Sequence, residues 1–239
     1  LQAHESGKPE SWLILDHKPS AGIYLGIKPG ADLSQLKNSK DLHKVMNFIE
    51  VQKNDYFEIT PGTPHAIGDG VTLLEPQRIL FGKSGKTFRL SDWQRRYNSK
   101  GELDPQSGSP RDLHFEAGMR CIQALGGQKK SHFHKKSSQL LLGEGVEILD
   151  FAPNAYYRTQ KLQTSKSVSL YCQVLGGYGV FTATKGSFKL SSQSHFVEIV
   201  AGNSVFLPAK SMPSIISTSG ASQGVLVSPA YGAPYWKKI

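Results

Sequence analysis

The sequence predicts a mainly all-β fold made of two β-barrels with one short helical insertion. Short stretches rich in β-branched and aromatic residues recur along the chain, separated by Gly, Pro, Asn or Asp. The segments "NDYFEITPGTPHAI" at 54–67 and "AGNSVFLPAKSMPSI" at 201–215 also share one outline. Each has a polar turn, a strand, a proline, a small-residue turn and an apolar strand. Repeated short strands of this kind are typical of sandwiches and barrels, so we expect two copies of one barrel.

The first half of the chain holds strand-like stretches and the one clear helical pattern. The stretch "ADLSQLKNSKDLHKVMNF" at 31–48 places its apolar residues on one helical face, interrupted once, with Asp32 or Ser34 as the cap. The strand-like stretches are "SWLILD" (11–16), "GIYLGI" (22–27), "NFIEV" (47–51), "YFEIT" (56–60), "VTLLEPQ" (71–77) and "TFRLSDW" (87–93).

The second half is a denser block of strand-like stretches. They lie at 146–152, 156–162, 168–177, 179–184, 188–192, 195–200, 204–209, 214–218 and 224–230. The polar segment at 126–140 separates this block from the first. We therefore predict two domains, 1–125 and 126–239.

Composition and charge narrow the classes of protein. The chain has 239 residues and a net charge of +9, yet it has no zinc-finger spacing and no recognition-helix pattern. We therefore expect a small anionic substrate rather than nucleic acid. No apolar run reaches the ~20 residues of a membrane span, so we expect no membrane partner. Two cysteines are too few for a disulfide scaffold, which predicts reduced thiols in a cytoplasmic protein, here expected to be a monomer.

One histidine stands where a metal ligand is expected. His65 follows the turn Pro61–Pro64 at the mouth of a predicted hairpin, and the N-terminal stretch offers Gln2, His4 and Glu10 as companions. Gln2 and His4 are two residues apart and would share one face of a strand. Imidazole, carboxylate and amide ligands suit Zn²⁺ with one position open for water or substrate. The stretch that begins at Leu1 reads as the middle of a structured region, so we expect further residues upstream.

The remaining histidines lack such a setting. His132 and His134 are also two apart, with Gln139 beyond them, but they lie in a lysine-rich and exposed segment. We expect no metal there. His114 in "RDLHFE" is expected to be a hydrogen-bonded structural residue, and His17, His43 and His195 have no ligand-like spacing.

These residues together carry a family resemblance. The proline-glycine turn ending in His65 resembles the second motif of the cupin barrel, and Gln2-x-His4 with Glu10 is similar to its first motif. The stretches "GKPESW", "GTPHAIGDGVTLLEPQ" and "KTFRLSDWQRR…RDLHFE" resemble the type I mannose-6-phosphate isomerases, which are zinc-dependent cupins. The resemblance implies a metal-binding catalytic cupin domain at 1–125 and a cupin-like domain without metal at 126–239.

The N-terminus departs from that family. Only five residues separate His4 from Glu10, whereas family members have a longer insertion there and more sequence before the Gln-x-His pair. Two interpretations stay open. Either this is a compact variant with all four ligands, Gln2, His4, Glu10 and His65, or "AHESG" is a local look-alike and the first ligands lie upstream.

The resemblance also implies a chemistry. The family interconverts mannose 6-phosphate and fructose 6-phosphate through a cis-enediol, so we expect a phosphorylated hexose as substrate and one Zn²⁺ per chain. Arg89 matches the arginine placed over the reacting carbons, and Lys8 matches the lysine beside the zinc glutamate. Glu75 is expected to be the general base or a partner of the metal ligands. Looser candidates for phosphate contact are Lys83, Lys86, Arg95 and Arg96.

Two other classes of protein fit parts of the pattern. A non-catalytic sugar-binding cupin would keep a pocket but dispense with Arg89, Glu75 or the metal. A metal-dependent cupin oxygenase would use a histidine–carboxylate iron site and would leave "KPE" and "TFRLSDW" unexplained. Bound metal and isomerase turnover distinguish the three.

Overall fold

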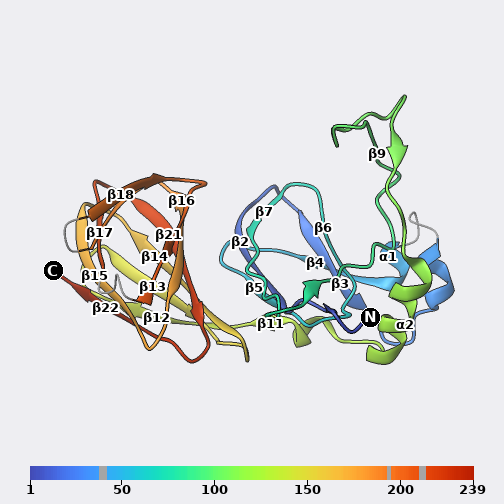
Figure 1. Cartoon of the computed structure of the whole chain (residues 1–239), viewed down its shortest axis with the longest axis horizontal. Helices are drawn as coiled ribbons and strands as arrows, with labels where there is room; N and C mark the ends of the chain where they lie inside the picture. The colour runs from blue at the N-terminus through green and yellow to red at the C-terminus, as the bar shows by residue number, and fades with distance from the viewer. Residues whose placement is uncertain (38–41, 193–194, 210–213) are drawn as a thin grey trace. The chain divides into compact units, whose positions relative to one another are not determined.

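The chain forms two compact units, Leu1–His134 and Lys135–Ile239. The structure, a computed structural model, describes residues 1–37, 42–192, 195–209 and 214–239 (Figure 1). Strands dominate both units, which confirms the predicted all-β fold class. The division falls later than the predicted boundary between residues 125 and 126. The reason is Phe133, which is buried in the core of unit 1 and keeps the segment before it there.

Unit 1 is built around a four-stranded and a three-stranded sheet. The larger sheet has the order β11-β5-β2-β7, with strands His134–Lys135, Tyr56–Ile59, Glu10–His17 and Val71–Leu74. The smaller one has the order β4-β3-β6, with strands Met46–Glu50, Gly22–Ile27 and His65–Ile67. Two short pairs complete the unit: β1 (Glu5–Ser6) runs parallel to β8 (Ser84–Gly85), and β9 (Arg96–Tyr97) pairs with β10 (Ser109–Pro110).

Alternation along β2 explains how this strand presents both core and site residues. Side chains two apart on a strand share a face, so Glu10, Trp12 and Ile14 point the same way. Trp12 and Ile14 are buried in a core cluster with residues of β3 and β5. The same face therefore ends in the carboxyl group of Glu10 at the first residue of the strand.

Three helical segments contribute to a second, smaller core in unit 1: η1 (Leu33–Lys37), α1 (Leu42–Val45) and α2 (Phe115–Leu125). A fourth, η3 (Lys130–His132), has no buried residue. Ile122 of α2 packs with Leu36, Val45 and Met46, and Met119 and Phe115 lie against them. The predicted helical insertion is thus present as two short pieces, and its centre at 38–41 lies outside the described residues.

Unit 2 contains two larger sheets. The six-stranded sheet has the order β12-β13-β14-β21-β16-β19, with strands Ser137–Leu141, Val146–Phe151, Tyr157–Thr164, Ser222–Pro229, Gly179–Lys185 and Ser204–Leu207. The five-stranded sheet has the order β18-β17-β20-β15-β22, with strands His195–Val200, Ser187–Ser192, Ser214–Thr218, Val168–Leu175 and Ala233–Lys238. The described strand pairings within both sheets are antiparallel, for example between β14 and β21.

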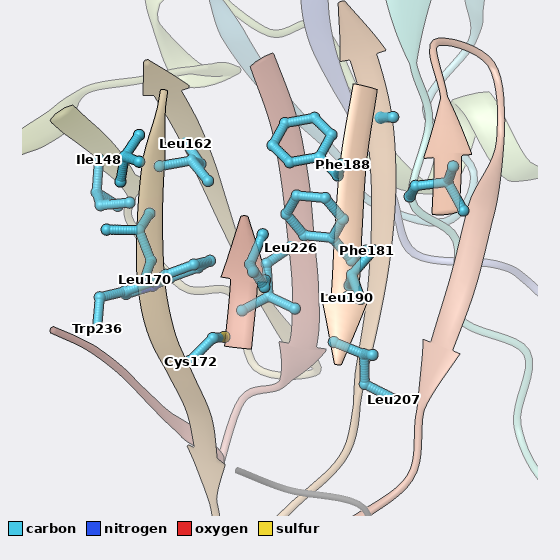
Figure 2. Packing of buried hydrophobic residues seen from close by; sticks show 14 of the residues in the cluster. Ile148, Leu162, Leu170, Cys172, Phe181, Phe188, Leu190, Leu207, Leu226 and Trp236 are labelled. Atoms are coloured by element: carbon cyan, nitrogen blue, oxygen red, sulfur yellow. The ribbon is translucent and has the colours of Figure 1, made fainter. Parts of the chain in front are cut away.

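The core of unit 2 draws on both of its sheets (Figure 2). Phe181 and Phe188 meet edge to face with ring centroids 5.0 Å apart, an arrangement that aromatic pairs favour. Trp236 donates from Nε1 to Gln160 Oε1 at 2.8 Å, which satisfies two buried polar groups. Burial raises the pKa of the Cys172 thiol to about 12, so this cysteine is a packing residue.

Two expectations for unit 1 were wrong in detail. The stretch 87–93, predicted as a strand, has no strand conformation. His114 takes the place of a neighbouring strand there, because its Nδ1 accepts the Arg89 N–H at 3.2 Å and its own N–H bonds to the Arg89 carbonyl at 2.8 Å. Helix α2 was not predicted, although Gly126, with φ of 71°, ends it as glycine often does.

In the described part of the chain, no helix is both long and apolar enough to span a membrane.

Candidate active site

A tight turn and a strand bulge position His65. His65 opens β6 directly after the turn at 61–64 and pairs with Leu25 of β3. The pairing of β3 with β4 shifts register between Tyr24 and Ile27, and Gly26 inside this bulge has φ of 71°. Its N–H bonds to the Pro64 carbonyl at 2.9 Å. The bulge thus ties the turn to the barrel wall and fixes where the histidine begins.

Hydrogen bonding sets the direction of the His65 ring. Nδ1 lies 2.8 Å from the carbonyl oxygen of Thr63, and a carbonyl can only accept, so Nδ1 carries a proton. In the neutral ring Nε2 then presents a lone pair, and it lies 3.4 Å from Oε2 of Glu10. The edge of Trp12 closes the other side, with ring centroids 5.3 Å apart. A histidine held through one nitrogen by a carbonyl is the arrangement that metal-binding histidines use.

Glu10 is the buried carboxylate of the site. Only 5% of the residue is exposed, and its Oε1 lies 3.1 Å from the ammonium of Lys8. Burial raises the pKa of Glu10, and a hydrogen bond with Glu75 adds to that rise, while the charges of His65 and Lys8 oppose it. A carboxylate in this position is stabilised by any cation placed between it and His65.

Glu75 and Gln77 support this centre from the return strand side. Partial desolvation of its carboxyl group would raise the pKa of Glu75, but hydrogen bonding with Glu10 and Gln77 holds the pKa below its usual value. Gln77 accepts a bond from Lys8 Nζ at 3.0 Å, and its backbone forms an isolated bridge with Glu10. Gln77 therefore links the ammonium to the second carboxylate.

Two adjoining cavities open beside His65. The first holds about 360 Å³ and is lined by Lys8, Glu10 and His65 on one side and by the apolar face of α2 on the other. The second holds about 200 Å³ and is lined by His65, Arg89 and Trp93. Both include the turn that precedes His65, so this residue stands between them. The first cavity alone has the size and lining common among small-molecule sites, and the second adjoins it at His65.

Arg89 faces the second cavity while its backbone is fixed. Its N–H donates to His114 Nδ1 at 3.2 Å, which confirms the structural, hydrogen-bonded role expected for His114. The guanidinium makes a 3.5 Å bond to the Asp112 carbonyl. The guanidinium thus keeps most of its donors for other partners, since one carbonyl engages only one of five.

Gln2 and His4 belong to an exposed turn outside the strands that carry Glu10 and His65. They were expected on one strand, and that expectation was wrong, because residues 3 and 4 form a turn and β1 begins only at Glu5. The turn is closed by bonds of 2.9 Å from Glu5 N to the Gln2 carbonyl and from Gln2 N to Glu5 Oε2. Both side chains are exposed, and neither lines the cavities.

The donor set fits a zinc ion in kind but supplies two ligands. The His65 lone pair and the Glu10 carboxylate face each other, as zinc ligands must. Across residues 1–37, 42–192, 195–209 and 214–239, however, no group of three or more His, Cys, Asp or Glu residues is close enough together to hold a metal. His134, the alternative candidate, instead lies 3.0 Å from Asp55.

The looser phosphate candidates already have contacts of their own. Lys86 lines the first cavity and pairs with Glu5 at 2.9 Å. Arg95 pairs with Asp92 at 2.6 Å. The other two bond to backbone carbonyls, Lys83 to Ala3 and Arg96 to Gly108. Of the four, Lys86 alone lines either cavity.

Comparison with known proteins places the chain beside one group of enzymes. It is 26% identical over 207 residues to mannose-6-phosphate isomerase ManA of Bacillus subtilis, and 28% identical over 202 residues to mannose-6-phosphate isomerase of Streptococcus mutans. These matches cover 85% and 81% of this chain. The predicted resemblance to the mannose-6-phosphate isomerases is confirmed. No family model matches the chain.

Solved structures of mannose-6-phosphate isomerases share the fold. The crystal structure of the Bacillus subtilis enzyme matches with a TM-score of 0.70 at 23% identity, covering 93% of this chain and 65% of that one. A phosphomannose isomerase from Salmonella typhimurium matches with a TM-score of 0.61 at 11% identity. The chain spans a little under three fifths of the length of its curated relatives, since it covers 59% of ManA and 58% of the Streptococcus enzyme.

Sequence reasoning missed three residues that shape the site. The Thr63 carbonyl orients His65, and backbone atoms leave no signal in residue type. Gln77 was read only as part of a strand, whereas β7 ends at Leu74 and Gln77 forms an isolated bridge with Glu10. Trp93 was read as the end of a strand, yet it lines the cavity of Arg89.

Proposed function

We propose that the chain is the catalytic part of a zinc-dependent aldose–ketose isomerase that interconverts mannose 6-phosphate and fructose 6-phosphate. The observation that carries the proposal is the facing pair of His65 Nε2 and Glu10 Oε2 beside two cavities lined by Lys8 and Arg89. The similarity to named mannose-6-phosphate isomerases over more than four fifths of the chain supports the choice of reaction.

Zinc is assigned to Glu10 and His65. A bound Zn²⁺ would act as a Lewis acid on the oxygens of the sugar. Residues of this chain orient the two ligands. The Thr63 carbonyl fixes the His65 proton on Nδ1, and Lys8, itself bonded to Gln77, pairs with the Glu10 carboxylate. The ligand roles of Gln2 and His4 stay predictions, which metal content of a His4→Ala variant checks.

The reaction moves one proton between neighbouring carbons. A base removes the proton from C2 of the open-chain aldose, and the electron pair forms the enediolate. The proton returns to C1 and the hydroxyl proton passes from O2 to O1, which gives the ketose, so no oxidant is needed. We assign the base role to Glu75, supported by its exposure and by a pKa below its usual value, which keep it ionised at neutral pH.

The alternative for Glu75 is a purely supporting role. It hydrogen-bonds Glu10 and lines neither cavity, which favours a residue that orients a metal ligand. Glu75→Gln separates the two roles. If Glu75 is the base, the variant should lose roughly 100-fold or more in kcat and retain its zinc. If Glu75 only orients a metal ligand, the zinc content should fall.

Arg89 and Lys8 supply positive charge on the two sides of His65. The planar fork of Arg89 suits the delocalised charge of an enediolate, and Lys8 can reach a sugar oxygen from the first cavity. Lys86, at the edge of that cavity, is the candidate for phosphate contact.

A sugar-binding cupin without turnover is the second candidate. It is favoured by the small number of metal donors, since no group of three His, Cys, Asp or Glu residues gathers in the described ranges. Such a module would keep both cavities and bind a hexose phosphate without converting it. It predicts binding with no change in the ratio of mannose 6-phosphate to fructose 6-phosphate.

One experiment tests the proposed activity. Zinc content and turnover of mannose 6-phosphate are measured for the unmodified chain and for His65→Ala, with His132→Ala as the matched control. We expect about one zinc per chain and measurable isomerisation, both lost in His65→Ala and both kept in His132→Ala. Full zinc occupancy in His65→Ala would sink the metal assignment, and binding without turnover would favour the second candidate.

The setting of the enzyme is part of the proposal. We propose a cytoplasmic protein whose small-molecule substrate accounts for its charge, supported by Cys121 and Cys172 both being free thiols. The monomeric state expected from the sequence stays a prediction, which light scattering after size-exclusion chromatography checks.

A further inference from the structure

Trp93 occupies an unusual position at the rim of the second cavity. It lines that cavity together with His65 and Arg89, and 41% of the residue is exposed. One side of its ring rests against Tyr24, with centroids 5.6 Å apart and planes inclined by 47°. Tyr24 packs in turn against Phe48, at 5.2 Å. A large exposed aromatic side chain is thus fixed from behind and open toward the cavity.

The backbone under Trp93 is strained. Trp93 has φ of 52° and Gln94 has φ of 58°, the left-handed region that bulky side chains avoid. Two such residues in a row persist only where the surroundings force them, and strain of this kind gathers at functional sites. The conformation needs a cause in the contacts around it.

Asp92 closes the turn that contains both residues, because its carbonyl accepts the Arg95 N–H at 2.9 Å. Its side chain anchors this turn: Asp92 is 7% exposed and receives Arg111 through Nε at 2.7 Å and Nη2 at 2.6 Å, and Arg95 through Nη2 at 2.6 Å. Arg111 also lies 4.7 Å over the ring of Tyr97. The carboxylate therefore joins the two strands of an arm, residues 94–111, just where the chain passes Trp93. The arm projects away from the barrel of unit 1 (Figure 1).

We propose that Trp93 is the stacking platform of a sugar subsite, on which the apolar C–H face of a hexose 6-phosphate lies while Arg89 and His65 face its oxygens. The identity of the ligand rests on the function proposed above; the platform itself rests on the cavity and the fixed ring. One face of a pyranose carries mainly C–H groups, and an indole offers a flat apolar surface for them without many rotamers to freeze.

Charge and geometry favour this ligand over a purely anionic one. Arg89 provides the cation at the cavity wall, and the aromatic rim adds a contact that phosphate alone cannot use. Pockets that bind small molecules combine an apolar aromatic surface with a few polar groups that fix orientation, as here. Trp93 thus contacts the C–H face of the sugar ring, and Arg89 faces the oxygens of the sugar.

Binding by calorimetry tests the subsite without need of turnover. The ligands are mannose 6-phosphate and inorganic phosphate, and the variants are Trp93→Ala, Trp93→Leu and Trp93→Phe. We expect Trp93→Ala and Trp93→Leu to raise the Kd for mannose 6-phosphate roughly fivefold, Trp93→Phe about twofold or less, and none to change the Kd for phosphate. Leu103→Ala, an exposed change on the same arm, is the matched control and should bind like the unmodified chain.

The outcomes separate this subsite from the proposed activity. An unchanged Kd for mannose 6-phosphate in Trp93→Ala overturns the subsite, as does an equal loss for phosphate or no binding of mannose 6-phosphate by the unmodified chain. If the unmodified chain binds through Trp93 but shows no turnover, the isomerase assignment fails and the subsite stands. If the unmodified chain converts mannose 6-phosphate and Trp93→Ala binds it normally, the subsite fails and the isomerase assignment stands.

Discussion

At the scale of single residues, one hydrogen bond decides what His65 can do. The Thr63 carbonyl takes the proton of Nδ1, so Nε2 is left to face Glu10 at 3.4 Å. The sequence could predict that Glu10 and His65 meet, because their motifs resemble those of one family. It could not predict the turn at residues 3 and 4, because that turn depends on Glu5 bonding back to Gln2.

Arg89 offers a prediction that separates charge stabilisation from binding. Deprotonation creates charge that the neutral sugar lacks, so a residue that meets this charge acts mainly in the transition state. We expect Arg89→Ala and Arg89→Lys to lower kcat by roughly 100-fold, because one preorganised donor is worth about that and an ammonium does not reproduce a planar fork. Steady-state kinetics on mannose 6-phosphate, with zinc content beside it, provides the measurement.

The matched control for Arg89 removes a charge elsewhere. Arg120 lies exposed on α2 and lines neither cavity, so Arg120→Ala should leave kcat and KM unchanged. Folding of the Arg89 variants should survive, since the bonds with His114 use backbone atoms of residue 89. A raised KM at nearly normal kcat would instead make Arg89 a phosphate-binding residue.

At the scale of elements, the positions of most strands could be predicted from the sequence, but the strands with which they pair could not. Alternating apolar stretches gave β2, β3 and β5 close to their observed bounds. The stretch 87–93 has the same composition but no ladder, because a histidine side chain accepts the Arg89 N–H in place of a neighbouring carbonyl. Helix α2 carries a readable pattern, Phe115, Met119 and Ile122, which falls on one helical face.

The bulge at Gly26 gives a prediction on stability. A Cβ there would lie 2.5 Å from the ring of the buried Phe133, and φ is 71°. Gly30 has a similar φ of 74° but open space around a Cβ, so Gly30→Ala isolates the backbone cost. We expect Gly30→Ala to cost about 1 kcal/mol and Gly26→Ala about 2–4 kcal/mol in free energy of unfolding. Urea unfolding measures both free energies. Equal costs would show that the Phe133 ring moves aside without loss of stability.

The ion pairs of Asp92 with Arg95 and Arg111, here called the Asp92 clamp, predict how the stability of the arm depends on pH. Hydrogen bonds from Arg111 and then Arg95 hold the pKa of Asp92 below its usual value of 3.8. A depressed folded pKa means that this stabilisation is fully present above the unfolded value, near pH 4, and is lost progressively as pH falls from there through the lower folded pKa. We therefore expect the arm of the unmodified chain to become increasingly protease-sensitive as pH falls below about 4.

Asp92→Asn tests the cause of that change. The amide cannot pair with two guanidinium groups as a carboxylate does, so the arm of the variant should already be cleaved readily at pH 7. Its cleavage rate should then vary little between pH 7 and the acid range. Asp104→Asn, on the same arm and outside the clamp, serves as the control. An unmodified arm whose resistance does not fall anywhere in the acid range, where the native fold otherwise persists, would contradict the role given to Asp92.

At the scale of the whole molecule, a repeated outline in the sequence corresponds to two units with separate cores. The clusters around Trp12 and Ile122 use residues of unit 1, and the cluster around Phe181 uses residues of unit 2. The position of the boundary was less predictable, because the polar segment after α2 hides one buried aromatic residue, Phe133. The candidate site lies within unit 1, so the positions of its residues depend on the packing of that unit.

Because the two units have separate cores, we expect a destabilising substitution in one unit to lower the unfolding temperature of that unit alone. Phe181 is fully buried against Phe188, so Phe181→Ala should destabilise unit 2 by about 3–5 kcal/mol through lost contacts and a cavity. In scanning calorimetry we expect one transition to move down by roughly 10 °C or more while the other stays in place. Zinc binding should persist below the lower transition, because Glu10 and His65 belong to unit 1. Phe206→Ala, an exposed change in the same unit, should move neither transition. A joint downward shift of both transitions in Phe181→Ala would show instead that the catalytic unit depends on unit 2 for its stability.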